Sequence, residues 1–229
     1  MDSLIINPVA RIYNGYTSKF GIPRQAGLVQ SVDSQIIFEP AYRNPDSLRG
    51  LENISHIWLI WEFSRFTNKS WTPLIRPPRL GGNRKLGVFA TRSPLRPNPL
   101  ALSAVRLLDI TFNTPQGPVL NVAGADIMNG TPIYDIKPYI PYADALPQAT
   151  AGIFSQRPQK LDDVILPSPL PAFVSVSQIN ALKEILIEDP RPAYKTSPDE
   201  VYAFEYGNIH VEFVVKDNIV VITELSEQQ

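Results

Sequence analysis

The chain has 229 residues, 44% of them hydrophobic, and a formal net charge of −1, so there is enough apolar material for a sizeable core and a disordered chain is excluded. It has no cysteine, which excludes disulfides, thiolate nucleophiles and cysteine-bound metal centres, and its two histidines are too far apart in sequence to suggest a metal site. Its 23 prolines, well above the usual ~5%, argue against long helices. The first residues do not resemble a signal peptide and no apolar run is long enough to span a bilayer, so we expect a soluble, cytoplasmic protein without a metal.

Residues 1–155 predict a mainly β domain, either a barrel or a sandwich of short strands between proline- and glycine-rich turns. The expected strands are 9–14, 35–39, 56–63, 85–90, 102–110 and 119–127. The stretch HIWLIWEF at 56–63 is apolar at successive positions, which is typical of a central, buried strand. A helical turn is expected at 44–51, with Asn44 or Asp46 near its start.

The pattern changes after residue 155. Residues 156–170 are rich in proline and polar side chains and are expected to form a linker. Residues 171–229 then predict a small α+β domain. Its helix has Ser175 and Gln178 at the spacing of a capping box and ends before Pro190. Three strands are expected at the end of this domain, joined by hairpin turns, at 201–206, 209–215 and 219–225.

One segment of the chain is strongly cationic. No acidic residue lies between Glu62 and Asp109, although that interval holds nine of the 21 basic residues. Nucleic acid is the commonest partner of such a surface. The alternative is a solvated face whose charges pair with acids elsewhere in the chain. Within this segment GVFATRSPLRPNP, at 87–99, holds Arg92 and Arg96 on a loop stiffened by three prolines.

The sequence lacks the common catalytic signatures. No P-loop, dinucleotide-binding glycine motif or nucleophile elbow is present. Instead, short polar motifs stand where strands are expected to end: GIPRQ (21–25), LENISHIW (51–58), RPPRLGGN (76–83), GVFATRSPLRPNPLALS (87–103) and DIMNGTPIYDIKPYIPYAD (126–144). Such rigid loops present fixed hydrogen-bonding groups to a ligand.

These motifs, in this order, resemble the TsaA-like, or TrmO, family of tRNA methyltransferases. The resemblance covers nearly the whole chain and includes DPRPAY at 189–194, which is similar to a motif in the C-terminal extension of bacterial members. It implies a β-barrel methyltransferase fold, usually a homodimer, that uses S-adenosylmethionine. The implied substrate is tRNA carrying threonylcarbamoyladenosine at position 37, which is methylated on N6.

The resemblance also implies a cofactor site. Its residues are Pro23, Arg24, Gln25, His56, Ile57, Arg92, Leu102, Asp126, Ile127, Met128 and Asn129. For Arg24 the alternative is a surface turn, for His56 a structural role at the start of a strand, and for Leu102 core packing. Asn129-Gly130 stands where the family more often has Asp-Gly, so a charged role at 129 is not expected.

Asp135 and Lys137 are the candidate catalytic residues. Asp135 is a candidate base for the substrate nitrogen, and Lys137 is a candidate to bind the threonyl carboxylate or a phosphate. The alternative is a mutual ion pair with a structural role. The reaction could proceed without such a base, since orientation alone supplies much of the rate of an in-line methyl transfer.

The RNA would lie along the cationic segment and stack on an aromatic ring. The expected substrate-binding residues are Arg76, Arg79, Arg84, Lys85, Arg96 and Tyr139. Two other functions remain open at this point: a non-catalytic barrel that recognises a modified anticodon loop, and a methyltransferase of the same fold acting on a small molecule. The basic segment argues against the second.

Overall fold

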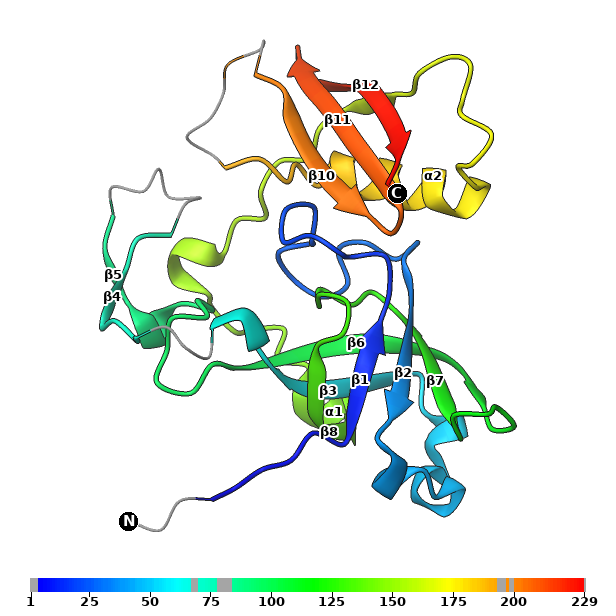
Figure 1. Cartoon of the computed structure of the whole chain (residues 1–229). Coiled ribbons are helices and arrows are strands. Elements are labelled where there is room, and N and C mark those ends of the chain that lie inside the picture. Colours follow the sequence, from blue (N-terminus) through cyan, green and yellow to red (C-terminus); the bar gives the residue numbers. More distant parts are fainter. Residues whose placement is uncertain (1–3, 67–69, 78–83, 193–196, 198–199, 229) are drawn as a thin grey trace.

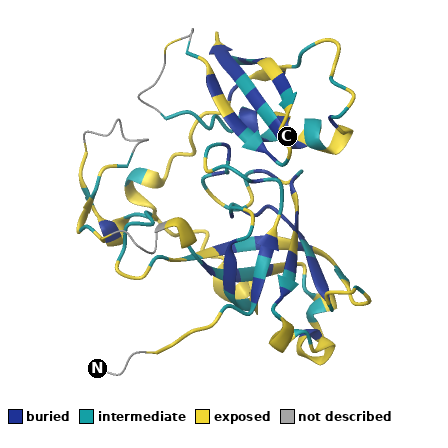
Figure 2. Ribbon diagram, viewed as in Figure 1, coloured by how far each residue is buried: buried dark blue, intermediate teal, exposed yellow. Residues whose placement is uncertain are grey.

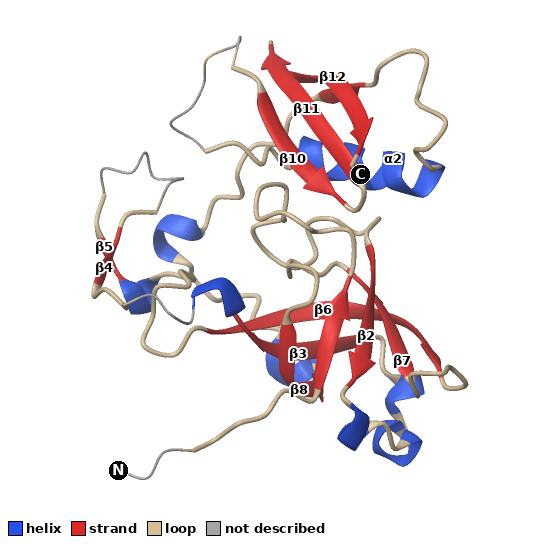
Figure 3. Ribbon diagram, in the orientation of Figure 1, coloured by secondary structure: helices blue, strands red, loops and turns tan. Residues whose placement is uncertain are grey.

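Two β-structured units, joined by loops, make up the protein (Figure 1). The structure is a computed structural model, and it describes residues 4–66, 70–77, 84–192, 197 and 200–228. Figure 3 shows that the chain between the two units is mostly loop and turn. Within the described residues, no helix has the length and apolar character needed to cross a membrane.

The N-terminal unit is a closed barrel of six antiparallel strands, which confirms the expected mainly β fold. Around the barrel the strands follow the order β1 (Ala10–Tyr13), β2 (Asp33–Phe38), β7 (Val119–Ala123), β6 (Leu100–Thr111), β3 (His56–Glu62) and β8 (Pro132–Pro138). β3 pairs with β6 on one side and β8 on the other, so it is flanked on both edges, as its apolar sequence predicts.

Buried and more exposed residues alternate along the barrel strands, and the buried ones form the barrel core (Figure 2). Ile57, Leu59 and Trp61 of β3 point inward and are buried, while Trp58 and Ile60 between them lie half-buried on the outer face. Ile57 and Leu59 belong to one buried cluster with residues of all the other barrel strands. Burial of this face is what closes the sheet on itself.

Some local expectations for this unit were wrong. Of residues 85–90, only β5 (Leu86–Gly87) is a strand, paired with β4 (Leu74–Ile75) as a short hairpin, and a 3₁₀ turn follows at Val88–Ala90. Residues 124–127 are a loop after β7. β8 was missed because proline is uncommon in central strands, but its two prolines stand at the strand's ends, where the ladder tolerates them.

Short helices fill several connections. The turn expected at 44–51 is present, and the Asn44 side chain accepts a hydrogen bond from the Asp46 amide at its start. The 3₁₀ turns of the connections are Pro40–Tyr42, Pro45–Leu48, Leu51–Asn53, Ser64–Phe66 and Gly152–Phe154, and α1 spans Pro141–Asp144.

The C-terminal unit is a four-stranded sheet covered by one helix. The sheet order is β10 (Tyr202–Tyr206), β11 (Ile209–Lys216), β12 (Ile219–Glu227) and β9 (Asp163–Ile165), and the helix is α2 (Val176–Ile187). Both halves of the expected capping box are formed, since Ser175 accepts from the Gln178 amide and Gln178 accepts from the Ser175 amide.

The segment 156–170 is more than the linker that its composition suggests. It contains β9, which pairs in parallel with β12, and it buries Leu161 and Val164 in the C-terminal core. A strand of three residues is too short to stand out among prolines and polar side chains.

The N-terminal part of the chain contributes to the hydrophobic core of the C-terminal unit. The loop between β1 and β2 leaves the barrel and buries Tyr16, Val29 and Val32 among residues of α2 and the C-terminal sheet. The Gly207 amide donates to the Gly15 carbonyl across this contact, at 2.8 Å. The loop therefore belongs to the barrel by sequence and to the C-terminal unit by packing.

Candidate active site

A cavity of about 930 Å³ opens at the end of the barrel that faces the C-terminal unit. Its walls come from the 19–26 loop, the end of β3, the 91–96 loop, the start of β6 and the segment that follows β7. Pro190 and Pro192 of the C-terminal unit complete the lining. Segments far apart in the sequence therefore meet around one space.

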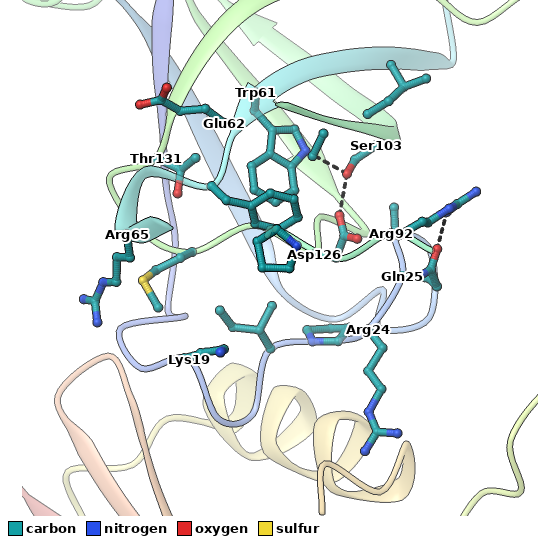
Figure 4. A pocket seen from close by; sticks show the side chains of 18 of the residues that line it. Lys19, Arg24, Gln25, Trp61, Glu62, Arg65, Arg92, Ser103, Asp126 and Thr131 are labelled. Atoms are coloured by element: carbon teal, nitrogen blue, oxygen red, sulfur yellow. Dashed lines mark hydrogen bonds between the residues drawn. The ribbon is translucent and has the colours of Figure 1, made fainter. Parts of the chain in front are cut away.

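Asp126 is anchored in this cavity by a chain of hydrogen bonds (Figure 4). Ser103 Oγ donates to Asp126 Oδ1 at 2.6 Å, and Trp61 Nε1 donates to Ser103 Oγ at 3.0 Å. Ser103 is buried on the inward face of β6. Sequence reasoning missed both Ser103 and Trp61, although a lone serine among inward-facing apolar residues of a strand is a usable signal.

Burial raises the pKa of the Asp126 carboxyl above its ordinary value. The hydrogen bond from Ser103, those from the Asp126 and Ala26 amides, and the positive charge of Arg92 all oppose this shift. The carboxylate is thus fixed in direction but poorly solvated. A cationic group bound in the cavity would compensate its charge.

The proline-stiffened loop supplies Arg92 to the same wall. Arg92 Nη1 donates to Gln25 Oε1, which ties the loop to the 19–26 loop (Figure 4). Arg96 Nη1 donates to the carbonyl oxygens of Thr91 and Ser93, at 3.0 and 3.2 Å. Arg96 therefore braces the turn that carries Arg92, and it also lines the cavity.

The lining is rich in cations. Among the described residues, its carboxylates are Glu62 and Asp126, and its cations are Lys19, Arg24, Arg65, Arg92 and Arg96. Figure 4 shows Arg65 and Lys19 on the opposite side of the cavity from Arg92. Aromatic and aliphatic walls lie between these sides, including Trp58, Trp61, Phe63 and Leu102. Such a site suits a ligand with a planar apolar body and several charged groups.

Comparison with known proteins identifies the family of this chain. The model of the tRNA-methyltransferase O N-terminal domain matches residues 11–145, and the model of the TrmO C-terminal domain matches residues 172–228. The chain belongs to the TrmO family.

Individual relatives agree with this assignment over nearly the full length. A "tRNA (adenine(37)-N6)-methyltransferase" of Escherichia coli is 35% identical over 225 residues, which cover 95% of each chain. A "putative S-adenosylmethionine-dependent methyltransferase RcsF" of Pseudomonas aeruginosa is 34% identical, with 91% of each chain covered. A crystal structure of TrmO from P. aeruginosa superposes with a TM-score of 0.80 at 28% identity and covers 99% of this chain and 98% of its own.

The cavity of this TrmO-family chain brings together most of the cofactor residues expected from the sequence. Pro23, Arg24, Gln25, Arg92, Leu102, Asp126 and Met128 all line it. The structure thus brings the 19–26 loop, the 91–96 loop and the segment after β7 together around one cavity. Their side chains do not all face the same way, and Arg24 is directed toward the C-terminal unit (Figure 4).

Four of the expected cofactor residues lie elsewhere. Ile57 and Ile127 are fully buried in the barrel core. His56 is exposed at the opposite end of β3 from Trp61, with its Nδ1 3.0 Å from Ser55 Oγ. Asn129 lines a separate, shallower hollow, where its Oδ1 accepts a hydrogen bond from the Asn14 amide at 3.0 Å. Neighbouring residues of an extended chain point to opposite sides, so a continuous motif cannot contribute every side chain to one pocket.

Asp135 and Lys137, the candidate catalytic pair, do not line the cavity. They form an ion pair on β8, with Lys137 Nζ 2.8 Å from Asp135 Oδ2, and both side chains are about half-exposed. The geometry therefore matches the structural alternative for this pair. Tyr139, just beyond the strand, packs against Trp58 with ring centroids 5.4 Å apart and also lies outside the lining.

The cationic residues expected to bind RNA are near the β4–β5 hairpin. Arg76 follows β4, and Arg84 and Lys85 precede β5; all three are exposed. Arg79 lies outside the described residues.

In the described part of the chain, no group of three or more His, Asp or Glu side chains is arranged to hold a metal ion.

Proposed function

We propose that this protein is an S-adenosylmethionine-dependent tRNA methyltransferase that modifies N6 of adenine 37, next to the anticodon. The observation that carries the proposal is the cavity at the barrel end, in which a poorly solvated, anchored carboxylate lies among cationic side chains. Membership of the TrmO family and the printed names of the full-length relatives support the same activity.

The residues present fit this cofactor. When bound, S-adenosylmethionine supplies a methyl group on a positively charged sulfur. Asp126 offers the buried negative charge that such a sulfonium favours, and Arg92 offers a guanidinium for the cofactor's carboxylate. Trp61, Phe63 and Leu102 supply apolar wall for an adenosine.

The chain's contribution to the reaction is chiefly orientation. Because Asp135 does not line the cavity and is paired with Lys137, we do not assign it the role of base. Holding the acceptor nitrogen in line with the methyl group lowers the barrier, and the proton that the nitrogen loses on methylation passes to solvent water. The hydrogen bonds from Trp61 to Ser103 and from Ser103 to Asp126 keep the carboxylate in one position throughout.

The finer substrate is adenosine 37 carrying a threonylcarbamoyl group. That group ends in a carboxylate, and the Lys19 and Arg65 side of the cavity has the charge to receive it. The exposed cations Arg76, Arg84 and Lys85 would contact phosphates of the anticodon stem-loop.

The decisive experiment is mass spectrometry of tRNA nucleosides after incubation with the purified protein and methyl-labelled cofactor. One tRNA carries threonylcarbamoyladenosine, and a matched transcript carries plain adenosine 37. Label on the modified nucleoside alone supports the full proposal. Label on both transcripts retains the methyltransferase but removes the finer substrate. Cofactor and tRNA binding without any label would favour the non-catalytic RNA-binding alternative.

We also propose that the protein is a homodimer and acts in the cytoplasm. The outer face of β6 carries three exposed leucines, Leu100, Leu102 and Leu108, at 38%, 53% and 41% exposure, with Arg106 between the second and the third; Leu100 and Leu102 are also at the edge of the cavity. Exposed apolar side chains of this kind are a candidate for burial by a second copy. Light scattering of the purified protein tests the dimer, and a monomer at micromolar concentration would contradict it. Cell fractionation tests the location.

A further inference from the structure

Arg24 is directed at the C-terminal unit rather than at the interior of the cavity. Its Nη2 donates to the carbonyl oxygens of Asp189, at 3.2 Å, and of Arg191. Figure 4 shows the side chain extending away from Asp126 and Arg92. Two bonds from one charged donor to backbone oxygens 165 and 167 residues away join the 19–26 loop to the segment 189–192.

The segment 189–192 is itself rigidly built. Asp189 has a positive φ of 46°, a conformation that requires support from its surroundings. Arg191 supplies that support with a fork onto the Asp189 carboxylate, Nε to Oδ1 at 2.8 Å and Nη2 to Oδ2 at 3.1 Å. The Arg191 side chain is only 13% exposed, and its guanidinium lies 6.0 Å from the Tyr202 ring centre.

This construction presents two prolines to the cavity. Pro190 and Pro192 line it, one on either side of Arg191. Proline rings have a fixed φ and no amide to satisfy, so they form a stiff, apolar surface. The side chains of Asp189 and Arg191 are occupied by each other, which leaves Arg24 as the link between this surface and the barrel's own loop.

We propose that residues 189–192 are a wall of the methyl-transfer site, and that Arg24 is the positioning residue that holds the wall against the tRNA nucleotide rather than a ligand of the cofactor. The inference rests on the proposed function of the cavity. It assigns the C-terminal unit a direct part in the site. The contact is made by the Arg24 side chain with two main-chain carbonyl oxygens of that unit.

The course of the 19–26 loop indicates which ligand meets the wall. At one end of the loop Phe20 packs against Tyr202 and Phe213 of the C-terminal sheet. At the other end the Ala26 amide donates to the Asp126 carboxylate. Arg24 extends away from Asp126 toward the wall, which belongs to the C-terminal unit (Figure 4). With the sulfonium beside Asp126, the wall is left to face the nucleotide.

The test uses the full-length variants Arg24→Ala and Arg191→Ala, their double mutant, and Arg49→Ala as the matched control. Arg49 is an exposed arginine paired with Asp46 and lies outside the cavity lining. For each protein we would measure the cofactor Kd by calorimetry, kcat and KM for modified tRNA, and amide hydrogen exchange at Asp189 and Arg191. Circular dichroism checks folding, and Arg24→Gln, which is similar in length to a shortened arginine but carries no charge, replaces Arg24→Ala if that variant unfolds.

We expect Arg24→Ala and Arg191→Ala each to raise KM for tRNA about tenfold, the size expected for one lost charge-assisted hydrogen bond. The cofactor Kd should stay within about twofold, and amide exchange at Asp189 and Arg191 should accelerate. KM for tRNA in the double mutant should be no higher than in the more impaired single variant, because both substitutions release the same wall. Arg49→Ala should behave as the wild type.

Two results would overturn the proposal. The first is a cofactor Kd that rises tenfold in Arg24→Ala but not in Arg191→Ala, which would make Arg24 a cofactor ligand. The second is unchanged amide exchange at 189 and 191 in Arg24→Ala, which would show that Arg24 does not hold the segment. A wild type that binds cofactor but methylates no tRNA would sink the proposed function, while the exchange and cofactor measurements would still decide the role of Arg24.

Discussion

Asp126 is a carboxyl group whose behaviour depends on being buried. Its pKa is raised by burial, so the folded protein favours the neutral form more than the unfolded chain does. The stability that this group contributes is present below its ordinary pKa, about 3.9, and is lost as the pH rises through the folded value. Asp126→Asn cannot ionise, so its stability relative to wild type should increase between about pH 4 and pH 7. Thermal unfolding across that range measures it, with the exposed Asp46→Asn as control.

The same substitution should act in the opposite direction on the cofactor. In the wild type, affinity for S-adenosylmethionine should rise with pH as the carboxylate ionises, because the bound sulfonium favours the charged form. In Asp126→Asn the affinity should be lower and nearly independent of pH between 4 and 7. Calorimetry at several pH values tests this, and parallel pH profiles in the two proteins would exclude a contact between Asp126 and the cofactor's charge.

Arg92 is expected to matter for activity and little for stability. Its side chain is exposed and bonded to Gln25, and the loop that carries it is braced independently by Arg96. Arg92→Ala should therefore lower kcat/KM at subsaturating cofactor roughly 10- to 100-fold, the loss of a charge-assisted contact of about 1.5–3 kcal/mol. The melting temperature of Arg92→Ala should stay close to that of wild type. In the control Arg49→Ala, kcat/KM and the melting temperature should both stay close to the wild-type values. Unchanged turnover in Arg92→Ala would remove the residue from the site.

At this scale the sequence singled out loops that the folded chain brings around one cavity, but it did not predict every side-chain direction. Gln25, Arg92 and Asp126 were identifiable because unusual motifs carry them. Ile57 and Ile127 share those motifs and yet point into the core, since alternate residues of an extended chain face opposite sides. The role of Ser103 depends on Trp61 and Asp126, which only the folded barrel brings within reach.

Among the elements, the β4–β5 hairpin is the one that sets the expected RNA surface. Arg76, Arg84 and Lys85 are exposed beside its two short strands. If each meets one phosphate, Arg84→Ala should reduce the log–log slope of tRNA affinity against salt by about one unit. Filter binding over a salt series tests this, with Lys183→Ala, an exposed cation on α2, as the control of equal charge.

The competing outcome for the hairpin is a structural role for its cations. In that case Arg84→Ala would leave the salt slope unchanged and lower thermal stability slightly, as the loss of a surface ion pair does. Cofactor affinity should be unaffected in both variants, because neither residue lines the cavity.

Most elements were predictable where local chemistry was strong. The capping box fixed the start of α2, and continuous apolarity identified β3 as a strand with two neighbours. β8 and β9 were not predicted, for different reasons. Prolines at its ends disguise β8, and β9 exists because β12 provides a partner for three residues that would not form a strand alone.

The contact between the two units dominates the molecule as a whole, and Gly21 tests it. Gly21 has a φ of +94°, and a Cβ placed there would lie 2.6 Å from Phe204 Cδ2. Gly50 has nearly the same φ, +92°, with nothing within 4 Å. Ala at either position should cost about 1 kcal/mol in backbone strain, but Gly21→Ala must also displace a buried ring.

Gly21→Ala should therefore lose clearly more free energy of unfolding than Gly50→Ala, and it should also weaken tRNA methylation because the 19–26 loop lines the cavity. Gly50→Ala should retain full activity. Denaturant unfolding and methylation assays measure the two effects. Equal losses of stability in both variants would mean that the loop yields to the methyl group and the contact between the units is soft.

The sequence predicted a barrel followed by an α+β domain, and the two family models divide the chain at similar places. It did not predict that the β1–β2 loop packs into the core of the C-terminal unit. Tyr16, Val29 and Val32 lie within residues 1–155, the range expected to form the barrel domain, and only the folded molecule places them against α2 and the C-terminal sheet. Long-range packing of this kind leaves no local pattern in the chain.

The packing of the β1–β2 loop into the C-terminal core also sets an order of events during synthesis on the ribosome. The barrel strands are complete once β8 has emerged, but the apolar loop at 14–32 finds its partners only when β12, almost the last segment made, joins the C-terminal sheet. At typical elongation rates of about 5–20 residues per second, the nascent chain spends several seconds with Tyr16, Val29 and Val32 uncovered. Chaperones that bind exposed apolar segments have their opportunity in that interval. A truncated chain released before β12 would be a natural target for proteolysis, however well its barrel had formed.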